Sequence, residues 1–391
     1  MTNVWRAVLS MLILVTAIAM EGTSTPSNRI TVDCSRGQSL NQTLAKLNKN
    51  TPITVSVSGT CTEYVQVVGF QGLTLKGLSG ATVVQPSTSA GKLFSAVLYI
   101  QSSNGLLVTG LNVTAGTTVS AIGIGHGSSD VRLRFLTVTG GGEGITVFEN
   151  SQVSIAYVKG LSPGYTTLGI YDSSDVHVEH SQFTAASGAT WNVGIALGAS
   201  HVTIYSTTIS NMQVGIGAYQ TSIVDLVNFN SYYSTGGPTD VTIENQAGTS
   251  FYGVSVDGGG SLNVASARLV INKPGQGSTT GGVVLSDSAS MYASKGNLVI
   301  TASNGQGVLA MDNAHATLTG ATVTGGAHGG LVAVNLSSID IAAGSTLSNI
   351  GGNAVDLFCD SNSWLTGTSN IAGAPASQCN NLLATETKTL P

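Results

Sequence analysis

The sequence predicts an all-β solenoid, a single elongated body in which short strands stack coil upon coil. A glycine followed by a branched apolar residue recurs along the chain, at successive spacings of 21, 25, 25, 21, 38, 29, 25 and 23 residues. These glycines are Gly123, Gly144, Gly169, Gly194, Gly215, Gly253, Gly282, Gly307 and Gly330. A repeat of this length, built of strands and turns without a helical pattern, is typical of solenoids.

The composition agrees with this class. Only 8% of the residues are charged, 42% are hydrophobic, and 50 are glycine. A chain this apolar does not match the composition of disordered segments, and abundant Ser, Thr, Val and Ile favour strands and turns. The formal net charge is −5 and no basic run is present, so we expect no nucleic-acid partner.

The N-terminus has the pattern of a secretory signal peptide. Arg6 precedes an apolar run from Ala7 to Met20, and small residues stand at Ala17 and Ala19. The run is short for a membrane span of about 20 residues. We therefore expect cleavage after residue 19, a secreted or cell-surface (periplasmic or extracellular) protein, and no membrane contact once the signal is removed.

The remaining chain divides into four parts. Residues 20–29 form a flexible leader rich in Thr, Ser and Pro, 30–104 an N-terminal cap with the first coils, 105–373 the regular coils, and 374–391 a C-terminal tail. Leu40, Leu44 and Leu47 recur at helical spacing within 38–49 and predict a short helix that covers the open end of the stack. The 38-residue step after Gly215 predicts a projecting loop over 228–252.

Four cysteines allow three disulfide pairings. Because the two ends of a solenoid lie far apart, we expect the pairs Cys34–Cys61 and Cys359–Cys379, one staple at each end. Disulfides suit an oxidising compartment, in agreement with a signal peptide.

The segment 168–183 is the clearest single coil. It predicts a strand at Gly169–Tyr171, a polar corner at Asp172–Asp175, and a second strand at Val176–Glu179. In Val-x-Val pairs such as Val176 and Val178, the valines point inward and the residue between them points outward. Neighbouring coils pair as parallel strands about 4.8 Å apart, so a dozen coils would form a rod roughly 55–60 Å long.

With these coils the chain resembles the right-handed parallel β-helix proteins, the pectin-lyase-like superfamily. The Gly-Ile…Val-x-Val coils carry the resemblance, together with the opening from Val32-Asp-Cys-Ser through Gly59-Thr-Cys-Thr-Glu-Tyr to Leu73-Thr-Leu-Lys-Gly. That opening is similar to the N-terminal part of secreted bacterial members. The resemblance covers nearly the whole mature chain and implies a right-handed parallel β-helix, but it implies no single activity. Its members include polysaccharide lyases, polygalacturonases, epimerases, phage tailspikes and surface adhesins.

The catalytic signatures of these families are incomplete here. Gly125-His126-Gly127-Ser128 resembles the Gly-His-Gly-x-Ser segment of polygalacturonases, but their Asn-Thr-Asp, Asp-Asp and Arg-x-Lys segments are absent. We therefore interpret the match as chance in a glycine-rich chain. No Asp-rich strand of the kind that calcium-dependent pectate lyases need is evident. We therefore expect no cofactor, and Ca²⁺ stays an open alternative that the sequence does not indicate.

A candidate site can still be followed across coils, because equivalent outward positions line up in columns. Aligning the valines at 131, 153, 176, 202 and 224 gives three columns. They are Arg132, Ser154, His177, Thr203 and Asp225; Arg134, Ala156, Glu179, Tyr205 and Val227; and Phe135, Tyr157, His180, Ser206 and Asn228. In a chain with 8% charged residues and six histidines, this is the strongest concentration of ionisable groups.

The residue types in these columns suit a uronic-acid or other acidic sugar. Arg132 and Arg134 would hold a carboxylate in bidentate fashion. His177 or His180 would act as general base, and Tyr205 or Glu179 as acid. Expected substrate-binding residues are Tyr165 and Trp191, which would stack on sugar rings, together with Tyr171, Asp172 and Asp225.

Other interpretations of the same residues remain open. Exposed strands also carry charges for solubility and for cross-strand pairs. Three ligands on one short strand rarely converge, so His177, Glu179 and His180 predict no zinc site. The remaining histidines at 126, 201, 315 and 328 are interpreted as isolated surface residues, and the serines of the repeated turns as turn hydrogen-bonding groups.

Two functions of different class follow from the sequence. The first is a secreted protein that binds polysaccharide on an outward strand face and, if it is an enzyme, cleaves it as a polysaccharide lyase or glycoside hydrolase. The second is a non-catalytic surface or matrix protein, whose weakly charged rod serves adhesion or scaffolding.

Overall fold

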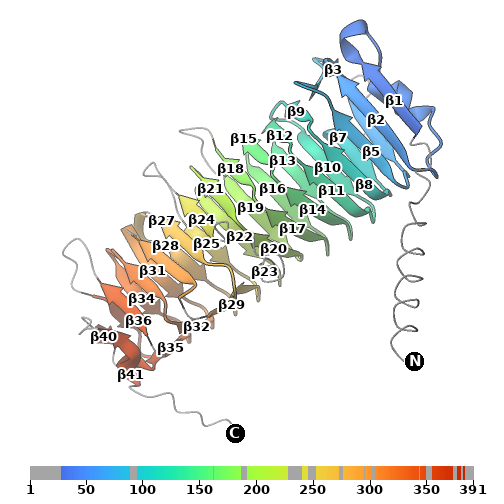
Figure 1. Ribbon diagram of the computed structural model, residues 1–391. Coiled ribbons are helices and arrows are strands. Elements are labelled where there is room, and N and C mark those ends of the chain that lie inside the picture. Colours follow the sequence, from blue (N-terminus) through green and yellow to red (C-terminus); the bar gives the residue numbers. More distant parts are fainter. Residues whose placement is uncertain are drawn as a thin grey trace, which may run out of the picture.

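The computed structural model describes residues 28–88, 95–161, 163–185, 192–227, 240–244, 252–272, 276–294, 296–301, 304–342, 344–348, 355–372, 377–379 and 382–383. Within these ranges the chain forms a parallel β-solenoid of about 12 turns, with three parallel sheets and almost no helix. Figure 1 shows an extended stack with the N-terminal strands at one end and the C-terminal strands at the other. The predicted fold, a single right-handed parallel β-helix, is confirmed.

Each turn adds one strand to each of three sheets, called here C, A and B in chain order. Sheet A contains β1 (Asn28–Asp33), β2 (Ile53–Ser58), β5 (Leu73–Gly77), β8 (Asn104–Thr109), β11 (Ser129–Arg134), β14 (Gln152–Ala156), β17 (Asp175–Glu179), β20 (His201–Tyr205), β23 (Ile223–Leu226), β26 (Ser261–Val264), β29 (Ser290–Ala293), β32 (His315–Thr319), β35 (Ser338–Ala342), β38 (Trp364–Thr366) and β41 (Leu382–Leu383). Sheet B contains β3 (Thr60–Thr62), β6 (Thr82–Val84), β9 (Asn112–Ala115), β12 (Thr137–Gly140), β15 (Lys159–Leu161), β18 (Gln182–Thr184), β21 (Thr207–Ser210), β24 (Val241–Glu244), β27 (Leu269–Asn272), β30 (Leu298–Thr301), β33 (Thr322–Thr324), β36 (Ser345–Ser348) and β39 (Ile371–Ala372). Sheet C contains β4 (Val65–Val68), β7 (Ala96–Gln101), β10 (Ser120–Gly125), β13 (Glu143–Val147), β16 (Thr166–Tyr171), β19 (Val193–Gly198), β22 (Val214–Tyr219), β25 (Tyr252–Val256), β28 (Gln276–Leu285), β31 (Asn304–Ala310), β34 (Gly329–Ala333), β37 (Leu357–Cys359) and β40 (Ser377–Cys379).

Inward side chains form ladders of branched apolar residues along the axis. In sheet A, Val131 pairs with Val153, Val153 with Val176, and Val176 with Val202. None of these four side chains is more than 5% exposed. Burial of apolar area contributes about 25 cal/mol per Å², so these ladders supply the main stabilising term of each coil. The inward and outward alternation predicted from the Val-x-Val pairs is the one observed.

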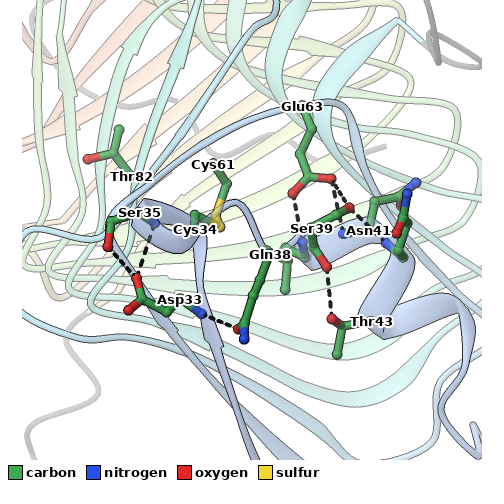
Figure 2. Close-up of a disulfide and its surroundings, with 12 residues drawn as sticks. Asp33, Cys34, Ser35, Gln38, Ser39, Asn41, Thr43, Cys61, Glu63 and Thr82 are labelled. Carbon is green, nitrogen blue, oxygen red and sulfur yellow. Dashed lines mark hydrogen bonds between the residues drawn. A yellow bond between two sulfur atoms is a disulfide. The ribbon is translucent and has the colours of Figure 1, made fainter.

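The N-terminal end is closed by a short helix and a disulfide (Figure 2). Helix α2 (Leu40–Ala45) buries Leu40 and Leu44 against the first coils. Glu63 accepts hydrogen bonds from Ser39 Oγ at 2.6 Å and from the Leu40 N–H at 2.7 Å, so its carboxylate lies at the start of the helix. Asn41 Oδ1 accepts the N–H of Gln66 at 3.0 Å, which satisfies a donor on the first strand of sheet C.

The helix is shorter than the predicted range of 38–49. Its C-cap is Lys46, and a turn follows, in which Asn48 Oδ1 accepts the N–H of Asn50 at 3.1 Å and Asn48 O accepts the hydroxyl of Thr51 at 3.3 Å. Asn side chains compete for the backbone in this way and favour turns over helix. A second short helix, the 3₁₀ turn η1 (Cys34–Arg36), precedes α2, and η3 (Thr368–Asn370) lies near the other end.

Both predicted disulfides are present. Cys34 and Cys61 join the turn η1 to β3 with a Cα–Cα distance of 5.1 Å, and Cys359 and Cys379 join β37 to β40 at 4.4 Å. The expected signal peptide, most of the leader and nearly all of the C-terminal tail lie outside the described residues, as do 228–239 and 245–251 of the expected projecting loop. None of the helices in the described ranges is long and apolar enough to cross a membrane.

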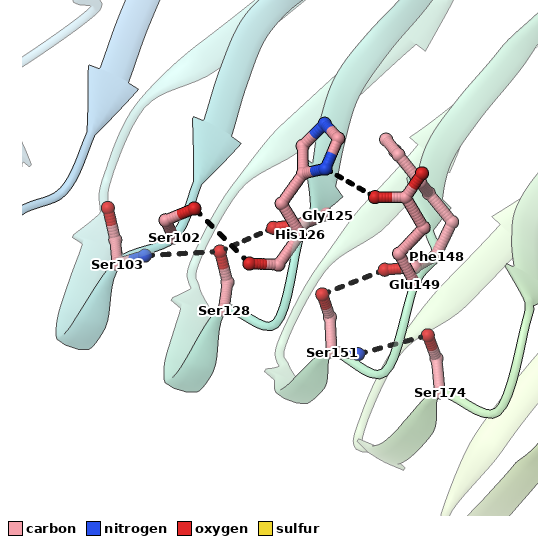
Figure 3. A network of polar contacts seen from close by, with 9 residues as sticks. All are labelled: Ser102, Ser103, Gly125, His126, Ser128, Phe148, Glu149, Ser151 and Ser174. Atoms are coloured by element: carbon pink, nitrogen blue, oxygen red, sulfur yellow. Dashed lines mark hydrogen bonds and ion pairs between the residues drawn. The ribbon is translucent and has the colours of Figure 1, made fainter.

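The corner between sheets C and A is built on buried serines (Figure 3). Ser128 Oγ donates to the carbonyl of Gly125 at 2.8 Å and accepts the N–H of Ser103 from the preceding coil at 3.3 Å. Ser174 Oγ accepts the N–H of Ser151 in the same way, at 3.2 Å. These serines are at most 1% exposed. They act as turn hydrogen-bonding groups, as the sequence predicted.

The corner between sheets A and B turns on a single left-handed residue. Phe135, Tyr157, His180 and Ser206 occupy this position in successive coils, with φ values of 54, 56, 46 and 47°. The connections between sheets B and C differ in length, from the gap between Gly140 and Glu143 to the gap between Val84 and Ala96. Those between sheets A and B differ as well, from the gap between Ser58 and Thr60 to the gap between Leu226 and Val241. The C–A corners stay short in every coil and therefore hold its register.

Candidate functional site

The outward columns predicted on sheet A are present in the predicted register. Arg132 pairs with Ser154, Ser154 with His177, and His177 with Thr203. The second column pairs Arg134 with Ala156, Ala156 with Glu179, and Glu179 with Tyr205. Five of the six residues expected to be catalytic therefore lie on the outer face of sheet A, on β11, β17 and β20, and His180 lies at its A–B corner.

The two arginines differ in their surroundings. Arg132 makes a bidentate contact with Asp130, with Nε at 2.9 Å from Oδ1 and Nη2 at 2.8 Å from Oδ2. This pairing lowers the pKa of the Asp130 carboxyl, chiefly through the hydrogen bond from Arg132. Arg134 makes no such pair within the described ranges, and it is exposed at the end of β11. Only Arg134 therefore has a guanidinium available for a ligand carboxylate, which corrects the expectation that both arginines hold one.

His177, Glu179 and Tyr205 form one contiguous polar group. The Tyr205 hydroxyl donates to Glu179 Oε2, and His177 Nε2 lies 3.7 Å from the same oxygen. Burial lowers the pKa of His177 in spite of the nearby carboxylate. Burial and the bond to Glu179 raise the pKa of Tyr205 well above its usual range. The group therefore combines a mostly neutral imidazole with a firmly protonated phenol.

His180 leaves this group and joins an aromatic stack on the A–B corner. Phe135 and Tyr157 are parallel within 12°, with ring centroids 4.9 Å apart, and Tyr157 and His180 repeat the same geometry. Tyr205 closes the stack edge-on to His180 at 5.4 Å. Phe135 is 60% exposed and Tyr157 48%. The left-handed residue in each coil thus directs a row of rings to the surface.

Small residues leave a depression on the same sheet, toward the starts of its strands. About 300 Å³ of open space lies over Ser154, and it is lined by Asp130, Val131, Gln152, Val153, Ser154, Asp175 and His177. Ser154 and Ala156 separate the two arginines from His177 and Glu179 along the columns. The depression has carboxylates at the strand starts, whereas Arg134 lies at the strand end.

Asp225 belongs to a separate row of side-chain hydrogen bonds, which the residue pattern alone did not predict. His201 Nε2 lies 3.0 Å from Asp225 Oδ2, and His201 Nδ1 lies 2.8 Å from Asp175 Oδ1. Asn263 donates to the other oxygen of Asp225 at 2.7 Å. The interpretation of His201 as an isolated residue was wrong. The column of Gln152, Asp175 and His201, each directly before the first valine of its strand, was the available signal.

Tyr171, Asp172 and Tyr165, three further expected binding residues, do not lie on the outer face of sheet A. Tyr171 points outward from sheet C and donates to Glu143 Oε1 at 2.8 Å. Asp172 follows it in the C–A corner with a left-handed φ of 56°. Tyr165 is exposed at the B–C corner, and Trp191 lies outside the described residues. The expected set is therefore divided among separate faces.

Two further histidines were also misread as isolated. His126 Nδ1 lies 2.5 Å from Glu149 Oε2 at the C–A corner (Figure 3). His315 Nδ1 lies 2.7 Å from Ser338 Oγ. Within the described ranges, the one grouping of potential metal-ligand atoms is Cys34, Cys61 and Glu63, and the disulfide engages both of its sulfurs.

Comparisons with known proteins found remote likenesses among solved structures. No family model matches the sequence, and no curated protein is similar to it in sequence. Among solved structures, the catalytic domain of a GH87 α-1,3-glucanase in complex with nigerose is 12% identical, with 90% of this chain and 70% of that chain covered and a TM-score of 0.39. The receptor-binding tailspike of bacteriophage Det7 is 10% identical, with coverage of 90% and 76% and a TM-score of 0.40. Pectate lyase Pel9A is 11% identical, with coverage of 85% and 81% and a TM-score of 0.33.

Likenesses at this level concern the fold and carry no activity to this chain. The assignment rests on the three continuous parallel sheets, each coil adding one strand to each sheet. With this topology the described part of the chain is a parallel β-solenoid of about 12 turns.

Proposed function

We propose that the protein binds an acidic polysaccharide along the A–B corner and the adjoining face of sheet A. The observation that carries the proposal is the exposed stack of Phe135, Tyr157 and His180, with a cationic residue on either side of it. A linear glycan lying along the axis would meet one ring per coil. We propose an extracellular or cell-surface setting, since the two disulfides are typical of an oxidising compartment.

The rings supply the apolar part of the contact. Exposed aromatic side chains in a row are unfavourable in water unless they serve packing or binding. Here Phe135 and Tyr157 stay 60% and 48% exposed although they stack on each other. The C–H faces of pyranose rings bury apolar area on such a platform, and coils about 4.8 Å apart repeat the contact.

The charges flanking the rings favour a carboxylated sugar. Arg134 directly precedes Phe135, and Lys159 begins β15 on the other side of Tyr157. Asp130 and Asp175 lie at the opposite ends of their strands, about four residues or roughly 13 Å away. A uronic-acid carboxylate would therefore lie near Arg134 and Lys159, and its hydroxyls would extend toward the depression over Ser154.

The group of His177, Glu179 and Tyr205 supports a further proposal, that the protein also cleaves or modifies the glycan that it binds. A neutral imidazole next to a protonated phenol is a suitable base and acid for cleaving or modifying the bound glycan. Burial keeps His177 largely unprotonated near neutral pH, because it lowers the pKa of the ring. Lyase or hydrolase activity is therefore the finer form of this proposal.

The test is affinity electrophoresis of the mature chain in gels containing polygalacturonate, alginate, pectin or a neutral glucan. Turnover is followed in parallel by unsaturated-product absorbance and by reducing ends. Wild-type protein is expected to be retarded by the acidic glycans, less so at high salt because exposed charges are screened. Arg134→Ala and Tyr157→Ala are both expected to lose this retardation.

Arg268→Ala is the matched control. It removes the same charge and breaks an exposed ion pair, that of Arg268 with Asp240, on a distant coil. Equal losses in Arg134→Ala and Arg268→Ala would reduce the effect to net charge and overturn the site. No retardation by any acidic glycan would overturn the function. Turnover that disappears in His177→Ala would add catalysis at this face.

A further inference from the structure

We propose a second binding site, on the outer face of sheet C, for a neutral hydroxylated sugar ring. A depression of about 300 Å³ opens there, lined by Ser95, Ala96, Tyr99, Ser120, Gly123, Thr146 and Phe148. Its volume lies at the lower end of the range for ligand pockets, which suits one ring and not a long chain segment. None of these residues belongs to the face on sheet A.

The floor of the depression exists because position 123 is glycine. Tyr99, Gly123 and Thr146 are register partners on three adjacent strands of sheet C. A Cβ on Gly123 would lie 2.9 Å from the Cβ of Ala96 and 3.1 Å from the Tyr99 ring. Any larger residue would therefore occupy the space between Tyr99 and Thr146.

Aromatic rings form one wall. Phe148 lies across Gly125, where a Cβ would come within 2.5 Å of its ring. The Phe148 and Tyr99 centroids are 6.3 Å apart, and His126 lies edge-on to both, at 6.0 Å from Phe148 and 6.4 Å from Tyr99. The bond from His126 to Glu149 holds this wall at the C–A corner (Figure 3). The wall offers an apolar surface for the C–H face of a sugar.

The polar rim has a defined direction of hydrogen bonding. Thr146 Oγ1 lies 2.6 Å from Glu143 Oε2, and an ionised carboxylate only accepts, so Thr146 donates. Its single proton is then used, and Ser120 Oγ, at 2.8 Å, must donate to Thr146. Tyr171 donates to the other oxygen of Glu143 at 2.8 Å. Within this chain, both rim hydroxyls have used their protons and retain acceptor lone pairs.

This direction selects the ligand. A group that contacts Ser120 and Thr146 finds acceptors there, so it must donate to them, as sugar hydroxyls do. Among the residues that the structure describes, the charged ones around it are Glu143 and Glu149, both acidic, with His126 paired to the latter. A carboxylated sugar would be repelled here, whereas it would be attracted at Arg134. The two faces thus select sugars of different charge.

Saturation-transfer-difference NMR on the full mature chain tests this site, with cellobiose, laminaribiose and galactobiose as probes. Wild-type protein is expected to transfer saturation to the ring C–H protons of at least one probe. Thr146→Val keeps the shape but removes the rim hydroxyl, and we expect an affinity about tenfold lower. Thr146→Ser should restore binding because it returns the hydroxyl.

Phe148→Leu replaces the flat ring by a side chain of similar apolar character and is expected to weaken transfer as well. Thr139→Val, the same change on sheet B, is the matched control, and thermal unfolding of each variant checks that it folds. No transfer to any probe, or equal losses in Thr146→Val and Thr139→Val, would overturn this site. Those results would leave acidic-glycan binding untouched, just as failure of polygalacturonate binding would leave this site standing.

Discussion

Removal of the Cys34–Cys61 disulfide is expected to loosen the N-terminal cap without unfolding the coils. The bond closes a loop with a sequence separation of 27 residues. The chain-entropy relation then gives a loss of about 3.5 kcal/mol in the free energy of unfolding for Cys34→Ala/Cys61→Ala. Alanine at 61 suits the site because Cys61 is only 2% exposed.

The loss should be local because each coil of a solenoid contacts only its neighbours. Without the disulfide, the cap keeps the carboxylate of Glu63 at the start of α2 and the burial of Leu40 and Leu44. Hydrogen exchange is the sharpest assay. The amides of Leu40 and Gln66, bonded to Glu63 and Asn41, should lose protection first, while the amides of the central coils keep theirs.

The double variant Cys359→Ala/Cys379→Ala is the control at the other end. Its separation of 20 residues predicts a similar loss, about 3.3 kcal/mol, from the same relation. Protection should then fall only near that end. A uniform fall of protection along the chain in either variant would refute the nearest-neighbour reasoning. An unchanged urea midpoint would refute the loop-closure estimate.

Three further predictions concern single side chains. Ser128→Ala should lower the free energy of unfolding by about 1–3 kcal/mol in urea melts, because it leaves the buried N–H of Ser103 without its acceptor. Ser129→Ala, at the partly buried neighbour whose hydroxyl donates to the side chain of Asn104, should change it by less than about 0.5 kcal/mol. Glu63→Gln should cost about 1.5–3 kcal/mol, since a charged acceptor at the start of α2 is lost, and a larger effect at low than at high salt would identify the charge. Burial lowers the pKa of His177 below its ordinary 6.5, so the unfolded chain binds that proton more tightly. The contribution of the neutral His177 ring to the free energy of unfolding is then fully present above pH 6.5. It is lost as the pH falls through the lower pKa that the ring has in the folded state. His177→Gln should flatten this part of the stability profile, and an unchanged profile would contradict the assignment.

Much of the fold could be predicted from the sequence because the same pattern of glycine and paired branched apolar residues recurs in most coils. Valines two residues apart set which side chains point inward, and one alignment of five valines gave the register of sheet A. The outward columns at Arg132, His177 and Tyr205 followed from that register alone. The helix of the cap was predicted in place but too long, because the turn at Asn48 ends it locally.

Which residues come together at the site was harder to predict, because this depends on the backbone conformation of the corners between the sheets. Tyr171 and Val176 are five positions apart, yet two left-handed residues, Asp172 and Ser173, direct them to different sheets. The pairing of Arg132 with Asp130 depends on a left-handed Asp130 at the start of β11, which no apolar pattern reports. His201 and Asp175 meet across coils, 26 positions apart.

The different lengths of the connections between the sheets indicate where this fold can accept inserted residues. An extra residue at one of the short C–A corners would shift a strand by one position and turn its inward side chains outward. The B–C connections already vary, from the gap after Gly140 to the gap after Val84, while the strands on both sides stay in register. Insertions, grafted peptides or library loops are therefore best placed there, where the chain can diversify without altering the ladders that fold it.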